Sequence, residues 1–373
     1  MSLLYLDFNR TTPLAPSVLE AMEPYWATHF MLPAQQHAQA NAVVEALEGA
    51  REGIAAMAGC ESFEIVFTGG GTEANNLAIL GLLLEAKPGH VLVSELEHES
   101  VLGPLQRLAE RDPDWVVESF PCDDNGIVDP ETVQSMIRDE TRLVCLQGAN
   151  PVLGTIQPIR AVADLCHSHG ICLHCDATQL FGKVPVDVKQ LRADTVSISG
   201  HKFYGPKGAG AVYVRRGLRL DPITFGEPRE MGLRPGAENV PGCIGLGAAS
   251  LLASKCCVEA NDRMAELRDS FVEQLHSQLD QPPTVLCDQS PRLPNTLAIE
   301  MPREARYLQQ ASRELAVAIA QSTLPPDEFT RSLRAIGRSD GEIGRTIRIS
   351  LGWTTSSEQI ERAAFLIAEA FDQ

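Results

Sequence analysis

His174-Cys175-Asp176-Ala177-Thr178-Gln179 and Ser199-Gly200-His201-Lys202 are the two segments of this sequence that decide its fold. Each follows a short run, residues 171–173 and 195–198, whose composition predicts a buried strand. Open α/β sheets build their sites where such strands end. An aspartate that keeps a pyridinium nitrogen protonated and a lysine that forms a Schiff base are the two protein groups that pyridoxal 5'-phosphate (PLP) requires. The sequence therefore predicts a PLP site at these strand ends.

The surrounding pattern extends this prediction to a whole domain. Between residues 60 and 215, apolar runs at 65–68, 90–94 and 143–146 alternate with helical stretches. This alternation is typical of a mainly parallel sheet that is covered by helices on both faces. Beyond residue 250 the helices become longer and the strands fewer. We expect a large cofactor-binding domain over residues 13–255 and a smaller α+β domain formed by residues 1–12 and 256–373.

Charge and composition restrict the class of protein. The chain has 373 residues, with 31 basic and 49 acidic residues and a formal net charge of −18, which argues against a duplex nucleic-acid binder. No apolar run approaches the ~18 residues of a membrane span, and the first residues lack the basic stretch of a signal peptide. We expect a cytoplasmic enzyme that binds neither nucleic acid nor membrane, with its ten cysteines reduced.

A glycine-rich turn, Thr68-Gly69-Gly70-Gly71-Thr72, stands between an expected strand and an expected helix. The free N–H groups of such a turn, together with the helix N-terminus, can hold a phosphate. The turn is neither a GxGxxG nor a Walker A motif, and alone it would fit a simple connection better than a phosphate site. Combined with the later aspartate and lysine, it predicts a phosphate cup. Gln179, three residues after Asp176, is placed to reach the phenolic oxygen of the cofactor ring.

A cluster of cysteines and histidines over residues 166–175 invites a metal interpretation. Cys172 and Cys175, however, are an odd number of positions apart on an expected strand, so their side chains point to opposite faces. Such geometry suits chelation poorly, and we expect no metal site.

Motifs along almost the whole chain resemble those of the cysteine desulfurases, in the class V aminotransferase branch of the fold-type I PLP enzymes. The fold implied is a mainly parallel seven-stranded sheet in a large domain plus a smaller α+β C-terminal domain, and the family is homodimeric. The motifs are Tyr5-Leu6-Asp7, Thr11-Thr12-Pro13, Thr72 to Asn76, Glu97-His98, Gly154 to Ile159, Asp176 to Gln179, Ser199 to Lys202, Gly232 to Gly236 and Arg348 to Gly352.

The resemblance also implies roles for individual residues. Lys202 would be the Schiff-base residue and proton shuttle, and His98 would stack on the cofactor ring. An arginine fork suits a carboxylate, so Arg348 would bind the α-carboxylate of a small L-amino acid. The implied phosphate-binding residues are Gly71, Thr72, Ser199 and His201. Asp176 would bind the ring nitrogen, and Asn150 and Gln179 would bind the phenolic oxygen. Asn9 and Arg10 would lie on the substrate side.

The sequence departs from the family on that substrate side. Arg10 stands where the family usually has alanine, and Ala237 replaces a threonine that contributes to the neighbouring subunit's phosphate site. Arg10 could favour a second anionic group on the substrate, or it could be an ordinary salt-bridged arginine. The stretch 315–326, which matches the family's sulfur-accepting loop, contains no cysteine. Formation of a persulfide on this chain is therefore in doubt, because a thiolate must come within bonding reach of the substrate sulfur.

Two hypotheses remain from the sequence. The first is an active PLP enzyme that is cysteine desulfurase-like but lacks the persulfide-forming cysteine. It would act on a small L-amino acid and could depend on a sulfur-acceptor or scaffold protein, with β-elimination or transamination as other possible outcomes. The second is a catalytically degenerate PLP-binding protein that serves as a partner.

Overall fold

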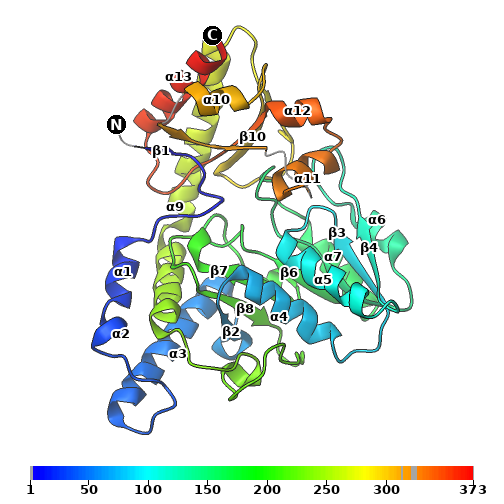
Figure 1. Ribbon diagram of the computed structural model, residues 1–373, viewed down its shortest axis with the longest axis vertical. Coiled ribbons are helices and arrows are strands. Elements are labelled where there is room, and N and C mark those ends of the chain that lie inside the picture. The colour runs from blue at the N-terminus through cyan, green and yellow to red at the C-terminus, as the bar shows by residue number, and fades with distance from the viewer. Residues whose placement is uncertain (1–2, 312–313, 321–325, 373) are drawn as a thin grey trace.

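The computed structural model describes residues 3–311, 314–320 and 326–372 (Figure 1). Its main element is a seven-stranded sheet in which only β8 runs antiparallel to its neighbours, so the expected mainly parallel sheet is confirmed. In spatial order the strands are β2 (Ile65–Thr68), β8 (Gly210–Val214), β7 (Thr195–Ser199), β6 (Cys172–Asp176), β5 (Thr141–Cys145), β3 (His90–Ser94) and β4 (Val116–Phe120).

Helices cover both faces of this sheet, and the alternation of side chains along each strand shows how. In β5, Leu143 and Cys145 join the apolar cluster formed with α4 (Gly71–Leu83) and α5 (Glu99–Arg111). The intervening Val144 points to the opposite face. There it joins the main core with α3 (Ala38–Ala58), α7 (Ile159–Ser168) and α9 (Val240–Gln278). Because both faces are buried, the strands read as nearly continuous apolar runs.

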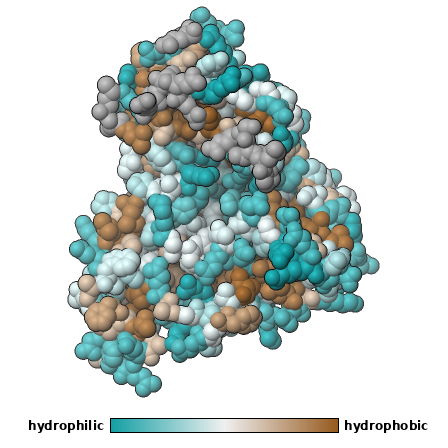
Figure 2. Space-filling model, viewed as in Figure 1, coloured by the Kyte–Doolittle hydropathy of each residue, from teal (hydrophilic) through white to brown (hydrophobic). Residues whose placement is uncertain are grey.

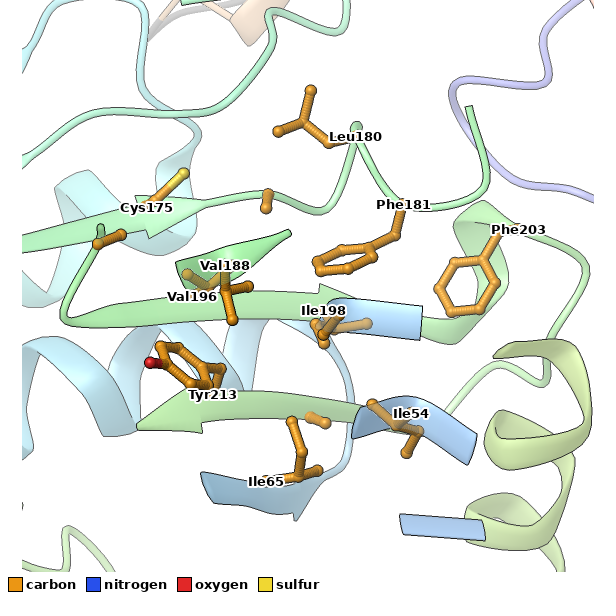
Figure 3. Packing of buried hydrophobic residues seen from close by; sticks show 14 of the residues in the cluster. Ile54, Ile65, Cys175, Leu180, Phe181, Val188, Val196, Ile198, Phe203 and Tyr213 are labelled. Carbon is orange, nitrogen blue, oxygen red and sulfur yellow. The ribbon is translucent and has the colours of Figure 1, made fainter. Parts of the chain in front are cut away.

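Part of the main core lies directly beneath the ends of β6 and β7 (Figure 3). Val196 and Ile198 of β7 pack there with Phe181 and Phe203, and all four side chains are almost completely buried. Phe203 follows the short 3-10 helix η2 (Gly200–Lys202), and Phe181 lies in the turn after β6. This packing anchors the two turns that carry Lys202 and Gln179.

The C-terminal part of the chain forms two further sheets. One is four-stranded and antiparallel, in the order β12 (Ala318–Ile319), β13 (Thr346–Ser350), β10 (Thr296–Glu300) and β9 (Thr284–Val285). In the other, β1 (Leu4–Tyr5) pairs with β11 (Leu315–Ala316) and so joins the N-terminal segment to this part (Figure 1). The remaining helices are α1 (Pro16–Met22), α2 (Pro24–Ala27), α6 (Pro130–Met136), α8 (Val188–Leu191), α10 (Arg306–Ala311), α11 (Glu328–Ala335), α12 (Asp340–Arg345) and α13 (Ser357–Asp372).

Helix α9 connects the two parts and passes unbroken through the proposed domain boundary at residue 255. Its first half, up to Ala253, packs into the main core, whereas Met264 and later residues pack into the cluster of the C-terminal part.

By length and composition alone α9 could cross a membrane, with a mean hydropathy of 1.4 over its most apolar window. That window is 56% buried inside the protein, as is typical of a core helix. The face of the molecule that Figure 2 shows mixes hydrophilic and hydrophobic residues.

Candidate active site

A cavity of about 280 Å³ lies at the carboxyl ends of β6 and β7 and extends to the C-terminal sheets. It brings together side chains from segments far apart in the sequence, among them Asp176, Lys202 and Arg348. The residues proposed from the sequence that line it are Asn9, Arg10, Gly71, Thr72, His98, Asp176, Gln179, Ser199, His201, Lys202 and Arg348.

Asp176 ends β6 as a buried carboxylate, only 6% exposed. It accepts hydrogen bonds from Asn75 Nδ2 at 2.8 Å and from the backbone N–H of Thr178 at 3.0 Å. Asn75 is itself fixed, because its Oδ1 lies 3.0 Å from His174 Nε2. Asp176 forms no ion pair with any residue that the structure describes. A buried carboxylate of this kind suits a protonated ring nitrogen, whose positive charge would complete the pair.

The N-terminus of α4 forms part of the cavity wall beside the ends of β6 and β7. Its N-cap, Gly70, offers no side chain to cap the first N–H groups, which leaves them for an anion. A Cβ at Gly71 would lie 2.8 Å from Thr178 Cγ2 and 3.3 Å from Ser199 Cβ, so only glycine permits this close approach. Hydroxyl groups of Thr72 and Ser199 line the same wall. This arrangement fits the phosphate of PLP.

His98 is the N-cap of α5 and is oriented by that helix. Its Nδ1 accepts a hydrogen bond from the backbone N–H of Ser100 at 3.0 Å and lies 2.7 Å from Ser100 Oγ. Because a backbone N–H can only donate, Nδ1 must be unprotonated in this arrangement. The ring is thus held in one orientation at the cavity wall, as a stacking role for His98 requires.

The environment of Lys202 favours its neutral amine. Burial lowers the pKa of Lys202 from 10.5 to about 8, and Arg348 and Arg10 act in the same direction, against Glu328 and Asp176. Its Nζ donates to the carbonyl oxygens of Asn9 at 2.7 Å and Arg10 at 3.1 Å. A neutral lysine amine is the nucleophile that a Schiff base needs.

The neighbouring His201 is held uncharged at neutral pH. Burial, followed by the positive charge of Lys202, lowers the pKa of His201 to about 4. Its Nδ1 lies 3.1 Å from Thr11 Oγ1. The imidazole therefore contributes hydrogen bonding rather than charge to the phosphate wall at neutral pH.

Arg348 lies on β13 at the substrate side, 6% exposed. It pairs with Asp7 and donates to the carbonyl oxygen of Pro151 at 3.2 Å, while its buried Nε has no partner among the described residues. An unpartnered guanidinium N–H at the cavity edge suits a carboxylate. Arg10 also lines the cavity, and none of the ion pairs among described residues involves it.

Two residues proposed from the sequence are committed to the protein itself. Asn150 does not line the cavity: its Oδ1 accepts from the N–H groups of Val152 and Leu153, and its Nδ2 donates to Ser332 Oγ at 3.0 Å. The side chain of Asn9 is likewise occupied, because its Nδ2 donates to Pro151 O and Thr296 Oγ1. Only the backbone of Asn9 acts toward Lys202.

The cavity also contains residues that the sequence did not single out, Gln147 and Glu328 among them. Neither lies in a recognisable motif, and Glu328 comes from the first turn of α11, more than a hundred residues from Lys202. Asn75 could have been found, since it belongs to the motif Thr72 to Asn76. Lys183, behind the cavity, follows Gln179 by four residues and thus shares its face of a helical turn.

None of the ten cysteines lines the cavity. Within residues 3–311, 314–320 and 326–372, no group of three or more histidine, cysteine or acidic side chains is arranged to hold a metal ion. The loop segment 321–325, part of the stretch expected to match the sulfur-accepting loop, lies outside the described residues.

Comparison with known proteins agrees with this geometry. Residues 4–363 match the family "Aminotransferase class-V". The chain is 36% identical to the cysteine desulfurase IscS of Dictyoglomus turgidum, over 96% of this chain and 91% of that protein, and 36% identical to IscS of Methanosarcina thermophila, over 98% and 91%.

Solved structures are similar over the same length. A NifS-like protein superposes with a TM-score of 0.92 at 29% identity, with both chains fully covered. The structure of SspA in complex with cysteine gives a TM-score of 0.83 at 32% identity and covers 93% of this chain and 98% of that one. Members of the family use PLP. The chain belongs to the class V aminotransferase family and is a cysteine desulfurase-like enzyme.

Proposed function

We propose that this protein is a PLP-dependent enzyme that removes sulfur from a small L-amino acid of the cysteine type and passes it to a thiol outside its own chain. The observation that carries the proposal is the cavity that unites Asp176, Lys202 and Arg348 while containing no cysteine. Two relatives support the substrate class: IscS is a cysteine desulfurase by name, and SspA was solved with cysteine.

PLP bound here would supply an electron sink that weakens bonds at the α-carbon of the amino acid. Asp176 would hold the proton on the ring nitrogen, and the N-terminus of α4 with Ser199 would hold the phosphate. Arg348 would bind the substrate carboxylate. Lys202, half neutral at its own pKa of about 8, could then accept a proton at the α-carbon and return one.

The sulfur step needs an acceptor, because sulfur that leaves cysteine as a persulfide must form a bond to another thiol. The balanced reaction is cysteine plus a thiol giving alanine plus the persulfide of that thiol. With no cysteine at the cavity, we propose that the thiol belongs to a small molecule or to a sulfur-acceptor protein in the cytoplasm. A homodimer, as in the family, is part of this proposal, although Ala237 would contribute no hydroxyl to the neighbouring site.

The test combines absorbance with product analysis. Purified protein with PLP should show a visible band that disappears in Lys202→Ala and persists in the control Lys189→Ala, an exposed lysine on α8. Cysteine with an added thiol should then give alanine and persulfide in equal amounts. Pyruvate, ammonia and sulfide in place of alanine would show β-elimination, and the absence of any spectral change with amino acids would favour a PLP-binding partner protein.

A further inference from the structure

Lys183 is a buried lysine directly behind the cavity wall. Its side chain is 4% exposed, and its Nζ donates to two amide oxygens, Asn9 Oδ1 at 3.0 Å and Gln179 Oε1. Lys183 follows Gln179 by four residues in the turns after β6, and its backbone N–H is fixed by the carbonyl of Leu180 at 3.0 Å. The lysine therefore connects the cavity residue Gln179 to the N-terminal segment.

These contacts determine the orientation of the Gln179 amide. Lys183 Nζ donates to Asn9 Oδ1 and to Gln179 Oε1 through N–H groups that both its charged and its neutral form possess, so the Gln179 atom that faces it is the oxygen. The amide nitrogen consequently faces the other way, and there Nε2 donates to the carbonyl oxygen of Asn9 at 3.1 Å. That same carbonyl accepts from Lys202 Nζ at 2.7 Å. Gln179 thus presents N–H groups, and no oxygen, beside the amine of Lys202.

The charges around Lys183 disfavour its charged form. The charged groups acting on it most strongly are Lys202 of η2 and Arg348 of β13, both positive, and burial together with these two places the pKa of Lys183 well below its ordinary value. The nearby acids act on other groups, since Asp7 pairs with Arg348 and Asp176 raises the pKa of Lys202. No described carboxylate forms an ion pair with Lys183. A neutral amine retains two N–H groups, which match the two amide oxygens.

We propose that Lys183 is a positioning residue that fixes the Gln179 amide as a hydrogen-bond donor toward the cofactor oxygen next to Lys202. This inference rests on the proposed function, because it assigns Gln179 to PLP. Lys183 does not line the cavity, and its side chain reaches it only through Gln179 and Asn9. A lysine retained merely for packing would have no such effect on the cofactor.

The proposal predicts a spectroscopic change. In Lys183→Met the Gln179 amide is free to turn, and its oxygen can replace the donor beside the cofactor. The phenolic oxygen then loses a hydrogen bond. It would therefore hold more tightly the proton that it shares with the Schiff base of Lys202. The pH midpoint of the visible band should therefore rise, by about one pKa unit if one charge-assisted hydrogen bond is lost. The matched control Lys189→Met, an exposed lysine, should leave the midpoint unchanged.

A double-mutant comparison separates positioning from simple charge. Gln179→Ala should raise the midpoint on its own, and adding Lys183→Met should then change it by less than about 0.3 units. Lys183→Gln, which keeps an N–H donor without a charge, should stay closer to the wild type than Lys183→Met does. If Lys183→Met does not fold, the pH midpoints of the Gln179→Ala and Lys183→Gln variants test the proposal on their own.

Two results would overturn the proposal: an unchanged midpoint in Lys183→Met, or an equal shift in the presence and absence of Gln179. A wild-type protein without any visible band would instead refute the proposed function itself. Thermal unfolding of each apoprotein shows whether a spectral change merely follows a loss of fold.

Discussion

Lys202 makes the stability of the apoprotein depend on pH in a direction that can be calculated. Its pKa is about 8 in the folded protein, against 10.5 for an ordinary lysine, chiefly because of burial. The unfolded chain therefore binds this proton more tightly than the folded chain. The resulting cost to stability is fully present below pH 8 and disappears as the pH rises toward 10.5. A difference of about 2.5 in pKa corresponds to a cost of about 3 kcal/mol.

The measurable part of this effect lies between pH 7.0 and 9.5, where about 2 kcal/mol of the cost should be recovered. Urea unfolding of the apoprotein at both pH values, for the wild type and for Lys202→Met, isolates the contribution of this lysine. Other titrating groups are common to both proteins. In Lys202→Met the hydrogen bonds from Lys202 to Asn9 and Arg10 are missing at both pH values. Their loss therefore cancels when the change in unfolding free energy between the two pH values is compared.

We expect the wild type to gain about 2 kcal/mol relative to Lys202→Met between these pH values. The same pKa means that about a quarter of Lys202 is neutral at pH 7.5, compared with about one part in a thousand for an ordinary lysine. The rate at which the apoprotein captures PLP should follow this titration. An identical pH dependence of stability in the two proteins would refute the reasoning, since Lys202 would then have an ordinary pKa.

Three other substitutions test the rest of the site. Arg348→Lys should raise the KM for the amino acid about 10- to 100-fold, by loss of the guanidinium fork, and leave the visible band unchanged in spectral titrations. Asn75→Leu should weaken PLP binding and lower the free energy of unfolding by about 3 kcal/mol in urea titrations, because Asp176 loses a donor and His174 a buried partner. Gly182→Ala should destabilise the protein by more than about 2 kcal/mol in thermal unfolding, because its φ is +73° and the new Cβ would lie 2.3 Å from Phe203 Cβ.

Those parts of the fold that depend on local patterns could be predicted from the sequence. The runs before Asp176 and Lys202 form β6 and β7, and both residues stand at strand ends as expected. The pairing of β1 with β11 could not be predicted, because each strand has two residues and the partners are more than 300 positions apart. Helix α9 spans the expected boundary at residue 255 without a break, and the core that it packs into changes between Ala253 and Met264.

The groups that carry chemistry could be proposed from the sequence and lie around one cavity, whereas several groups that orient them were not singled out. Asp176, Lys202 and Arg348 are recognisable because a cofactor requires a carboxylate, an amine and a guanidinium. Asn150 was assigned to the cofactor through the family resemblance, yet its amide oxygen accepts from the N–H groups of Val152 and Leu153. The role of Lys183 depends on which atom of an amide faces it, a property of the folded structure that residue type alone does not encode.

The distribution of thiols bears on how sulfur leaves the site. Cys122 and Cys287 belong to the apolar cluster that includes residues of α11, and Cys122 Sγ lies 3.7 Å from the carbonyl oxygen of Ala335. Burial raises the pKa of Cys122 to about 12 and that of Cys287 to about 11. Sulfur transfer requires a thiolate, so these thiols are poorly suited to replace a sulfur-accepting cysteine. Alkylation of the protein under native conditions should therefore leave alanine formation from cysteine and an external thiol intact, and inactivation that follows modification of a single cysteine would contradict transfer to an external acceptor.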